Sequence, residues 1–214
     1  GIHTKVPRRH IRNQCQDKCT TYYHYDGLDH FHAYDNDCDT DCNKCGAVRE
    51  IARKPVEVYS SSVTLGETLA INFFVDVAEL EEGEEYFLRI VKKYADGRAD
   101  VVKDIPSSEW PLSTAYAGFY EIAFDGIAAK EMGDTVIAQV YYADGEAAGA
   151  TYSDSIQAYA EYMLAYTNNA ELKTLLVDML NYGAAAQANF HYDEENLVNA
   201  NLTAAQQALA TKTV

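Results

Sequence analysis

Cysteine, histidine and aspartate residues are concentrated in one short part of the chain. All five cysteines lie between residues 15 and 45, and acidic or amide side chains occupy every second position from Asp35 to Asn43. Three kinds of chemistry use such residues: calcium binding by carboxylates, zinc binding by thiolates and imidazole, and disulfide formation. Each interpretation makes a different demand on the spacing.

Calcium binding fits the spacing least well. A twelve-residue calcium loop needs glycine at its sixth position and a bidentate carboxylate at its twelfth. Counted from Asp35, those positions hold Thr40 and Gly46. The pattern fails at both, which argues against a calcium loop.

Zinc binding fits better. Two cysteines separated by two residues and followed by Gly46 have the form of a metal knuckle, in which glycine admits the positive φ of a tight turn. One further cysteine and an upstream histidine would complete a tetrahedral site without an open position, so the ion would be structural. The predicted ligands are His32, Cys38, Cys42 and Cys45, with His30 and His24 as alternatives to His32.

Disulfide bonds remain an open alternative to zinc. If zinc takes three cysteines, Cys15 and Cys19 are left as a pair. If the cysteines form disulfide bonds instead, as is common in extracellular proteins, two bridges leave one of the five thiols unpaired. The knuckle spacing favours zinc slightly over disulfides.

The charge of the chain is strongly negative and unevenly distributed. The formal net charge is −16, with 33 acidic and 17 basic residues, which argues against a protein that binds a nucleic-acid backbone. No run of about 18 apolar residues is present, so the sequence predicts no membrane-spanning helix. A short basic arm precedes any acidic residue, and its charged members are Lys5, Arg8, Arg9 and Arg12.

The middle of the chain has the pattern of β-structure. Apolar residues alternate with others from Leu69 to Val77, which is the period of a strand with one buried face. Asp96-Gly97 between two such runs predicts a hairpin, and Gly126 to Met132 could form one helical turn. The predicted strands with bounds are 69–77, 85–94, 99–105, 116–124 and 135–142. We expect six or seven strands in all in the middle of the chain. Such a series is typical of a β-sandwich of immunoglobulin-like size.

The last third of the chain is predicted to be helical. Thr151-x-x-Asp154 and Asn168-x-x-Glu171 resemble capping boxes, and each precedes apolar residues at helical spacing. The two stripes are Ile156, Tyr159, Ala160, Met163 and Leu164, and then Leu172, Leu175, Leu176, Met179 and Leu180. They predict an αα-hairpin that packs on the sheet, with Gly183 allowing close approach of another segment and a short helix starting at Thr203.

The predicted fold class is therefore α+β, with four regions. They are a basic arm (1–14), a small Cys/His-rich module (15–55), an acidic immunoglobulin-like β-sandwich (56–150) and a helical region that packs on the sandwich (151–214).

Several segments resemble modules of large secreted or cell-surface proteins from anaerobic gut Firmicutes. One is the cysteine unit from His32 to Arg49, which is found there often in tandem. The others are Tyr120 to Met132, Tyr152 to Tyr159 and Leu175 to Gln187. The resemblance implies export to the cell surface and a non-catalytic accessory role, and it implies no ligand. A single copy of the cysteine unit departs from the tandem arrangement.

Aromatic residues supply the candidate ligand-binding positions. Trp110 could be an exposed ring for stacking on a glycan or could pack between strands. Tyr22 and Tyr23 could form a sugar-stacking platform or the core of the small module. No nucleophile motif, zinc-protease motif or phosphate-binding glycine loop is present, so we expect no enzyme.

The sequence thus favours a non-catalytic extracellular protein that works through protein–protein contacts, as an adhesin or a self-assembling subunit. The basic arm faces a body of net charge −17 over residues 56–214, which predicts docking on acidic surface of the same chain or of the next one. Docking on the next chain would be head-to-tail and would propagate into a filament. The alternatives are a carbohydrate-binding module and a module that binds a host protein such as an immunoglobulin. One structural zinc is the only cofactor expected.

Overall fold

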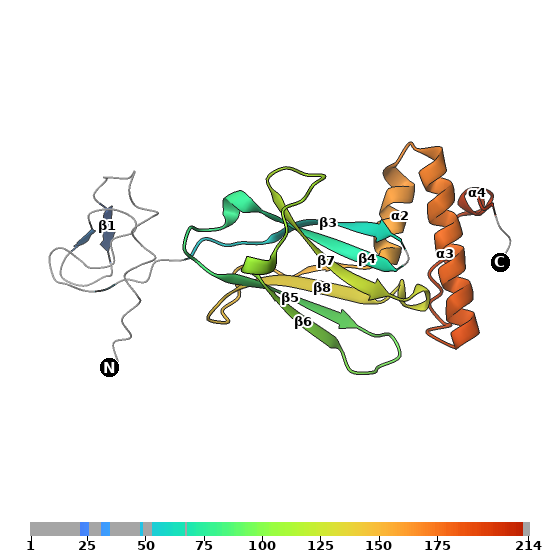
Figure 1. Ribbon diagram of the computed structural model, residues 1–214, viewed down its shortest axis with the longest axis horizontal. Coiled ribbons are helices and arrows are strands. Elements are labelled where there is room, and N and C mark those ends of the chain that lie inside the picture. The colour runs from blue at the N-terminus through green and yellow to red at the C-terminus, as the bar shows by residue number, and fades with distance from the viewer. Residues whose placement is uncertain (1–21, 26–30, 35–47, 49–52, 67, 212–214) are drawn as a thin grey trace. The chain divides into compact units, whose positions relative to one another are not determined.

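The computed structural model of the 214-residue chain describes residues 22–25, 31–34, 48, 53–66 and 68–211 (Figure 1). It divides into two compact units, Gly1–Lys54 with Glu81–Glu84, and Pro55–Leu80 with Glu85–Val214. In the first unit, β1 (Tyr22–Tyr25) pairs antiparallel with β2 (Phe31–Tyr34). The predicted basic arm and all five cysteines lie outside the described residues.

The described part of the second unit contains two antiparallel sheets. Their strands are β3 (Val58–Leu65), β4 (Leu69–Asp76), β5 (Tyr86–Lys93), β6 (Val101–Pro106), β7 (Phe119–Ile127), β8 (Thr135–Tyr142) and β9 (Tyr152–Asp154). One sheet has the order β3-β4-β7 and the other β6-β5-β8-β9, so the chain crosses between sheets after β4, after β6 and after β7. The α+β class is confirmed, and the two sheets are compatible with the predicted β-sandwich.

Side-chain alternation explains which faces of the strands are buried. In β5, Tyr86, Leu88 and Ile90 are at most 2% exposed, and the residues between them are partly exposed, as their period of two predicts. The prediction for β4 is wrong in one respect, because residues 70–75 are buried on both faces. Strand β4 lies between β3 and β7, and its Asn72 side chain donates hydrogen bonds to Ser62 and Thr64.

Helices cover one end of the sheets. They are α2 (Ile156–Tyr166), α3 (Ala170–Phe190) and the short α4 (Ala204–Gln207), and Figure 1 shows α3 between α2 and α4. The buried residues of α2 and α3 belong to the same apolar core as those of both sheets. The predicted helical hairpin therefore packs on the strands. None of the helices in the described part of the chain is both long and apolar enough to cross a bilayer.

The predicted cap of the first helix is wrong. Residues Tyr152–Asp154 form β9, which pairs with the start of β8, so Asp154 cannot belong to a helix. The helix is capped instead by Ser155, whose hydroxyl accepts a hydrogen bond from the backbone N–H of Ala158. Backbone pairing with the sheet extends the strand region to Asp154, the residue before the helix cap.

The other two helix starts lie close to their predicted positions. The N-cap of α3 is Asn169, one residue after the predicted Asn168, and its side chain accepts from the N–H of Leu172. Thr203 and Gln206 form a capping box at α4, as the sequence predicts. The single helical turn expected within residues 126–132 is η3 (Ala129–Glu131), a 3-10 helix.

The apolar stripes of the helices are mostly buried. Ile156, Ala160 and Leu164 of α2 are at most 4% exposed. In α3 the prediction fails for Leu175, which is 50% exposed, because the face toward the core includes Val177 instead. Gly183 on this face allows the close approach that the sequence predicts, since Met132 and Val198 lie directly above it.

Replacing Gly183 with alanine should destabilise the protein. A Cβ there would lie 2.7 Å from Met132 Sδ and 2.8 Å from Val198 Cγ2, which forces repacking that costs about 1–3 kcal/mol. The better helix propensity of alanine offsets about 1 kcal/mol of this cost. Urea unfolding measures the net loss, and Ala188→Gly at an exposed position of α3 measures the propensity term alone. A Gly183→Ala variant more stable than the parent would contradict this packing.

Candidate functional site

A lysine occupies a core position at the end of β5. The alternation that buries Tyr86, Leu88 and Ile90 also places Lys92 on the inner face, where it is 2% exposed. An unpaired ammonium in such a position would be very costly, so the surrounding structure must supply negative charge. It does so from two carboxylates that come from a different part of the chain.

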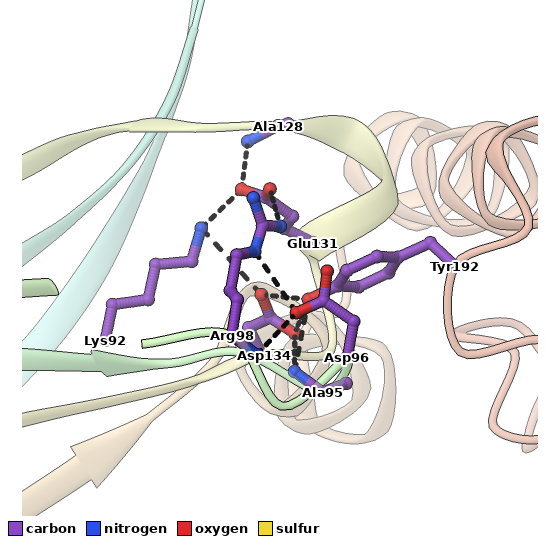
Figure 2. A network of polar contacts seen from close by, with 8 residues as sticks. All are labelled: Lys92, Ala95, Asp96, Arg98, Ala128, Glu131, Asp134 and Tyr192. Carbon is purple, nitrogen blue, oxygen red and sulfur yellow. Dashed lines mark hydrogen bonds and ion pairs between the residues drawn. The ribbon is translucent and has the colours of Figure 1, made fainter. Parts of the chain in front are cut away.

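Glu131 and Asp134 are those carboxylates, and Figure 2 shows both beside the end of the Lys92 side chain. The Lys92 ammonium lies 2.5 Å from Glu131 Oε2 and 3.9 Å from Asp134 Oδ2. Glu131 ends η3, and Asp134 immediately precedes β8, which pairs with β5. The two carboxylates are 7% and 4% exposed, so the whole contact is buried.

Glu131 has two further hydrogen-bond partners. Arg98, which follows the turn after β5, donates from Nη2 to Glu131 Oε1 at 2.8 Å. The backbone N–H of Ala128 donates to Oε2 at 3.4 Å. Burial alone would raise the pKa of Glu131. The hydrogen bond and positive charge of Lys92, together with the hydrogen bonds from Ala128 and Arg98, lower it instead. Glu131 is therefore held as a carboxylate.

Asp134 is held from the opposite side by Tyr192. The Tyr192 hydroxyl lies 2.7 Å from both carboxylate oxygens, and the backbone N–H of Ala95 donates to Oδ1 at 3.2 Å (Figure 2). Burial raises the pKa of Asp134 despite these hydrogen bonds. The pKa of Tyr192 is also raised, by burial and by Asp134, so its hydroxyl keeps its proton and donates.

These five residues, Lys92, Arg98, Glu131, Asp134 and Tyr192, form what we call the buried ionic cluster. It connects three segments that are distant in sequence: the β5–β6 hairpin, η3 with the start of β8, and the segment after α3. Arg98 and Tyr192 lie at its edge, where the Arg98 guanidinium is 3.8 Å from the centre of the Tyr94 ring. The cluster fastens the helical region to the sheet, and it places an amine beside a carboxyl group in a dry environment.

The sequence contains one signal for this cluster, which the interpretation of 85–94 as a half-buried strand left unused. The inward positions of the strand 85–94 continue from Tyr86, Leu88 and Ile90 to Lys92, so the alternation alone places a lysine in the core. The partners carry no such signal. Glu131 and Asp134 lie in a polar turn, and Tyr192 follows a helix, so only the folded chain brings them together.

Trp110 is a core residue, so of the two alternatives left open by the sequence its ring is not the exposed one. It is 5% exposed, its indole N–H donates to the carbonyl oxygen of Ile105 at 2.9 Å, and its ring packs edge-on against Tyr120. The alternative that the sequence left open, packing between strands, is what the structure shows. The ring is therefore packed inside the fold and is not exposed for stacking.

The remaining predicted site residues fall in the first unit. Tyr22 and Tyr23 belong to β1, and the backbone of His32 in β2 pairs with that of His24. Lys5, Arg8, Arg9 and Arg12 lie outside the described residues, as do the cysteines 15, 19, 38, 42 and 45. In the part of the chain that the structure describes, no three side chains of the His, Cys, Asp and Glu types are placed to hold a metal. The zinc, disulfide and docking assignments stay predictions.

Comparisons with protein-family models, with curated proteins and with solved structures find no match to this chain.

Proposed function

We propose that this chain is a non-catalytic extracellular protein of a bacterial cell surface that acts through protein–protein contacts, chiefly with further copies of itself. The resemblance of its cysteine unit and downstream segments to surface proteins supports the location. We further propose that the β-sandwich is immunoglobulin-like. Its sheets of three and four strands, with three crossings of the chain between them, support this proposal. The proposal includes a structural zinc at His32, Cys38, Cys42 and Cys45.

A pair of exposed tyrosines on α2 is the observation that carries the proposal. Tyr162 and Tyr166 are 61% and 71% exposed, and their ring centres lie 4.7 Å apart. They are one helical turn apart and point away from the stripe of Ile156, Ala160 and Leu164 that faces the core. Tyrosine is enriched where proteins meet, because it brings a large rigid ring with a polar end.

Further apolar side chains are exposed on α3. Leu175 and Tyr182, two helical turns apart on one side of α3, are 50% and 62% exposed, and Phe190 at its end is 63% exposed. Exposed apolar side chains gathered on one part of a protein commonly mark protein contacts. Tyr192, which follows α3, ties the end of the hairpin to the buried ionic cluster, and this contact would help to hold the exposed side chains in a fixed orientation.

Sedimentation velocity of the full chain over a concentration series tests the proposal. We expect the parent to form species larger than a monomer, and the double variant Tyr162→Ser, Tyr166→Ser to associate about 10- to 100-fold more weakly. Tyr59→Ser is the matched control, since Tyr59 is 70% exposed but lies on β3. A parent that stays monomeric at every concentration, or a control that weakens association equally, would refute the proposal.

A further inference from the structure

We propose that Lys92 and Asp134 become joined by an intramolecular amide bond, which the folded chain makes by itself with Glu131 as the proton carrier. The inference rests on the geometry of the buried ionic cluster and goes beyond the proposed function. Lys92 Nζ lies 3.9 Å from Asp134 Oδ2, and both side chains are at most 4% exposed. An amine and a carboxyl group are thus held together at a place from which bulk water is excluded.

Position and burial favour this bond for separate reasons. In water an amine and a carboxylate do not condense, because both are hydrated ions and water is the solvent. Here the pairing of β5 with β8 holds the two groups together, because Lys92 lies opposite Val136 and Asp134 is the residue before β8. This fixed position takes the place of a chance encounter in solution. Burial also destabilises the separated charges, so formation of a neutral amide with release of water relieves that cost.

Glu131 lies where a proton carrier is needed. Its Oε2 is 2.5 Å from Lys92 Nζ, so it can take a proton from the ammonium and generate the free amine that attacks. Arg98 and the Ala128 N–H keep the Glu131 carboxylate in place during this transfer. Glu131 Oε2 and Asp134 Oδ2 both face the Lys92 nitrogen, at 2.5 and 3.9 Å, so Glu131 can hold a proton taken from the nitrogen and return it for transfer to the departing oxygen.

The other side of Asp134 is arranged to stabilise negative charge. Oδ1 receives hydrogen bonds from the Ala95 N–H and from the Tyr192 hydroxyl. When the amine adds to Cγ, charge develops on this oxygen, and two preplaced donors stabilise it as an oxyanion hole does. Burial also raises the pKa of Asp134, which favours the protonated carboxyl group that an amine can attack.

The reaction balances without any added reagent. One proton passes from the Lys92 ammonium through Glu131 to Asp134 Oδ2, and the free amine then attacks Cγ. The nitrogen loses a second proton by the same path, the Cγ–Oδ2 bond breaks, and Oδ2 departs with both protons as water. A Lys92–Asp134 amide remains, and Glu131 ends as the carboxylate with which it began.

The mass of the intact chain decides the question. Under denaturing and reducing conditions we expect the parent to weigh about 18 Da less than its sequence mass, the mass of one water. Lys92→Met and Asp134→Ala should each show their full sequence mass. A parent at its full sequence mass would overturn the proposal, whether or not the variants fold.

Tryptic digestion locates the bond. Trypsin should fail to cut after Lys92 and should release residues 90–93 joined to residues 131–173, because cleavage still occurs after Arg89, Lys93, Lys130 and Lys173. The neighbouring pair Lys93 and Asp100 is the matched control. Its atoms are closer, at 2.7 Å, but its side chains are 54% and 39% exposed, so we expect no bond there. Complete cutting after Lys92, or an equal yield of linked Lys93, would contradict the proposal.

Glu131→Gln tests the proton carrier. Glutamine keeps the shape of the side chain but cannot accept the proton, so we expect a folded variant, verified by circular dichroism, at its full sequence mass. A variant that still loses water and yields the linked peptide would remove Glu131 from the reaction.

Discussion

Replacing Glu131 with alanine is expected to lower the free energy of unfolding by about 3–5 kcal/mol, because the Lys92 ammonium of this variant stays buried without its nearest carboxylate. Lys92 would keep only Asp134, at 3.9 Å, and Arg98 would lose its ion pair with Glu131. The Ala128 N–H would also lose its acceptor. Chemical denaturation followed by circular dichroism measures the loss.

An exposed ion pair on the same strand provides the control. Arg89 donates two hydrogen bonds to Asp104, at 2.8 and 2.7 Å, but about two fifths of each side chain is exposed. Asp104→Asn should therefore cost far less, because water and salt already screen that pair. Equal losses for Glu131→Ala and Asp104→Asn would show that burial does not set the strength of the cluster.

Replacing Trp110 with alanine is also expected to cost about 3–5 kcal/mol, as for other large aromatic residues removed from a core. The ring is 5% exposed and packs on Tyr120, so its removal leaves a cavity between the strands. Thermal or chemical unfolding checks this. The expectation also limits how binding experiments are interpreted, because loss of glycan binding in this variant would report partial unfolding.

Trp110→Phe tests the hydrogen bond of the indole N–H separately from the packing of the ring. Phenylalanine fills most of the space but leaves the carbonyl oxygen of Ile105 without the indole N–H, which costs about 1–3 kcal/mol for a buried acceptor. If Trp110→Ala were as stable as the parent, the side chain would not be part of the core.

Most of the strands could be predicted because their signals are local. Residues 135–142 alternate without interruption and pair over their full length with β5, so the predicted bounds are those of β8. The strand expected at 116–124 lies instead at Phe119–Ile127. Gly118 adopts φ of 89° there, and Ser113 bonds across the turn to Phe119, which delays the strand by three residues. Turn geometry of this kind depends on hydrogen bonds that the pattern of apolar residues does not contain.

The candidate site was predictable only in part, for a similar reason. Lys92 follows from the alternation of its own strand. Its carboxylate partners come from about forty residues further along and Tyr192 from about a hundred, and no local pattern marks them as buried. Leu175 shows the opposite kind of error. Helical spacing predicts that it lies in the core, but the tertiary packing leaves it exposed.

The pairing of Lys92 has a consequence for how faithfully β5 and β8 align. A slip of two residues between them would keep every apolar side chain on its own face, because side chains alternate with a period of two. The apolar pattern therefore cannot distinguish the native register from this one. The slip would, however, move Lys92 by about 7 Å along its neighbour and leave its ammonium buried without Glu131 and Asp134. A single buried charge thus gives the chain a means of rejecting a misaligned sheet that its hydrophobic residues would accept.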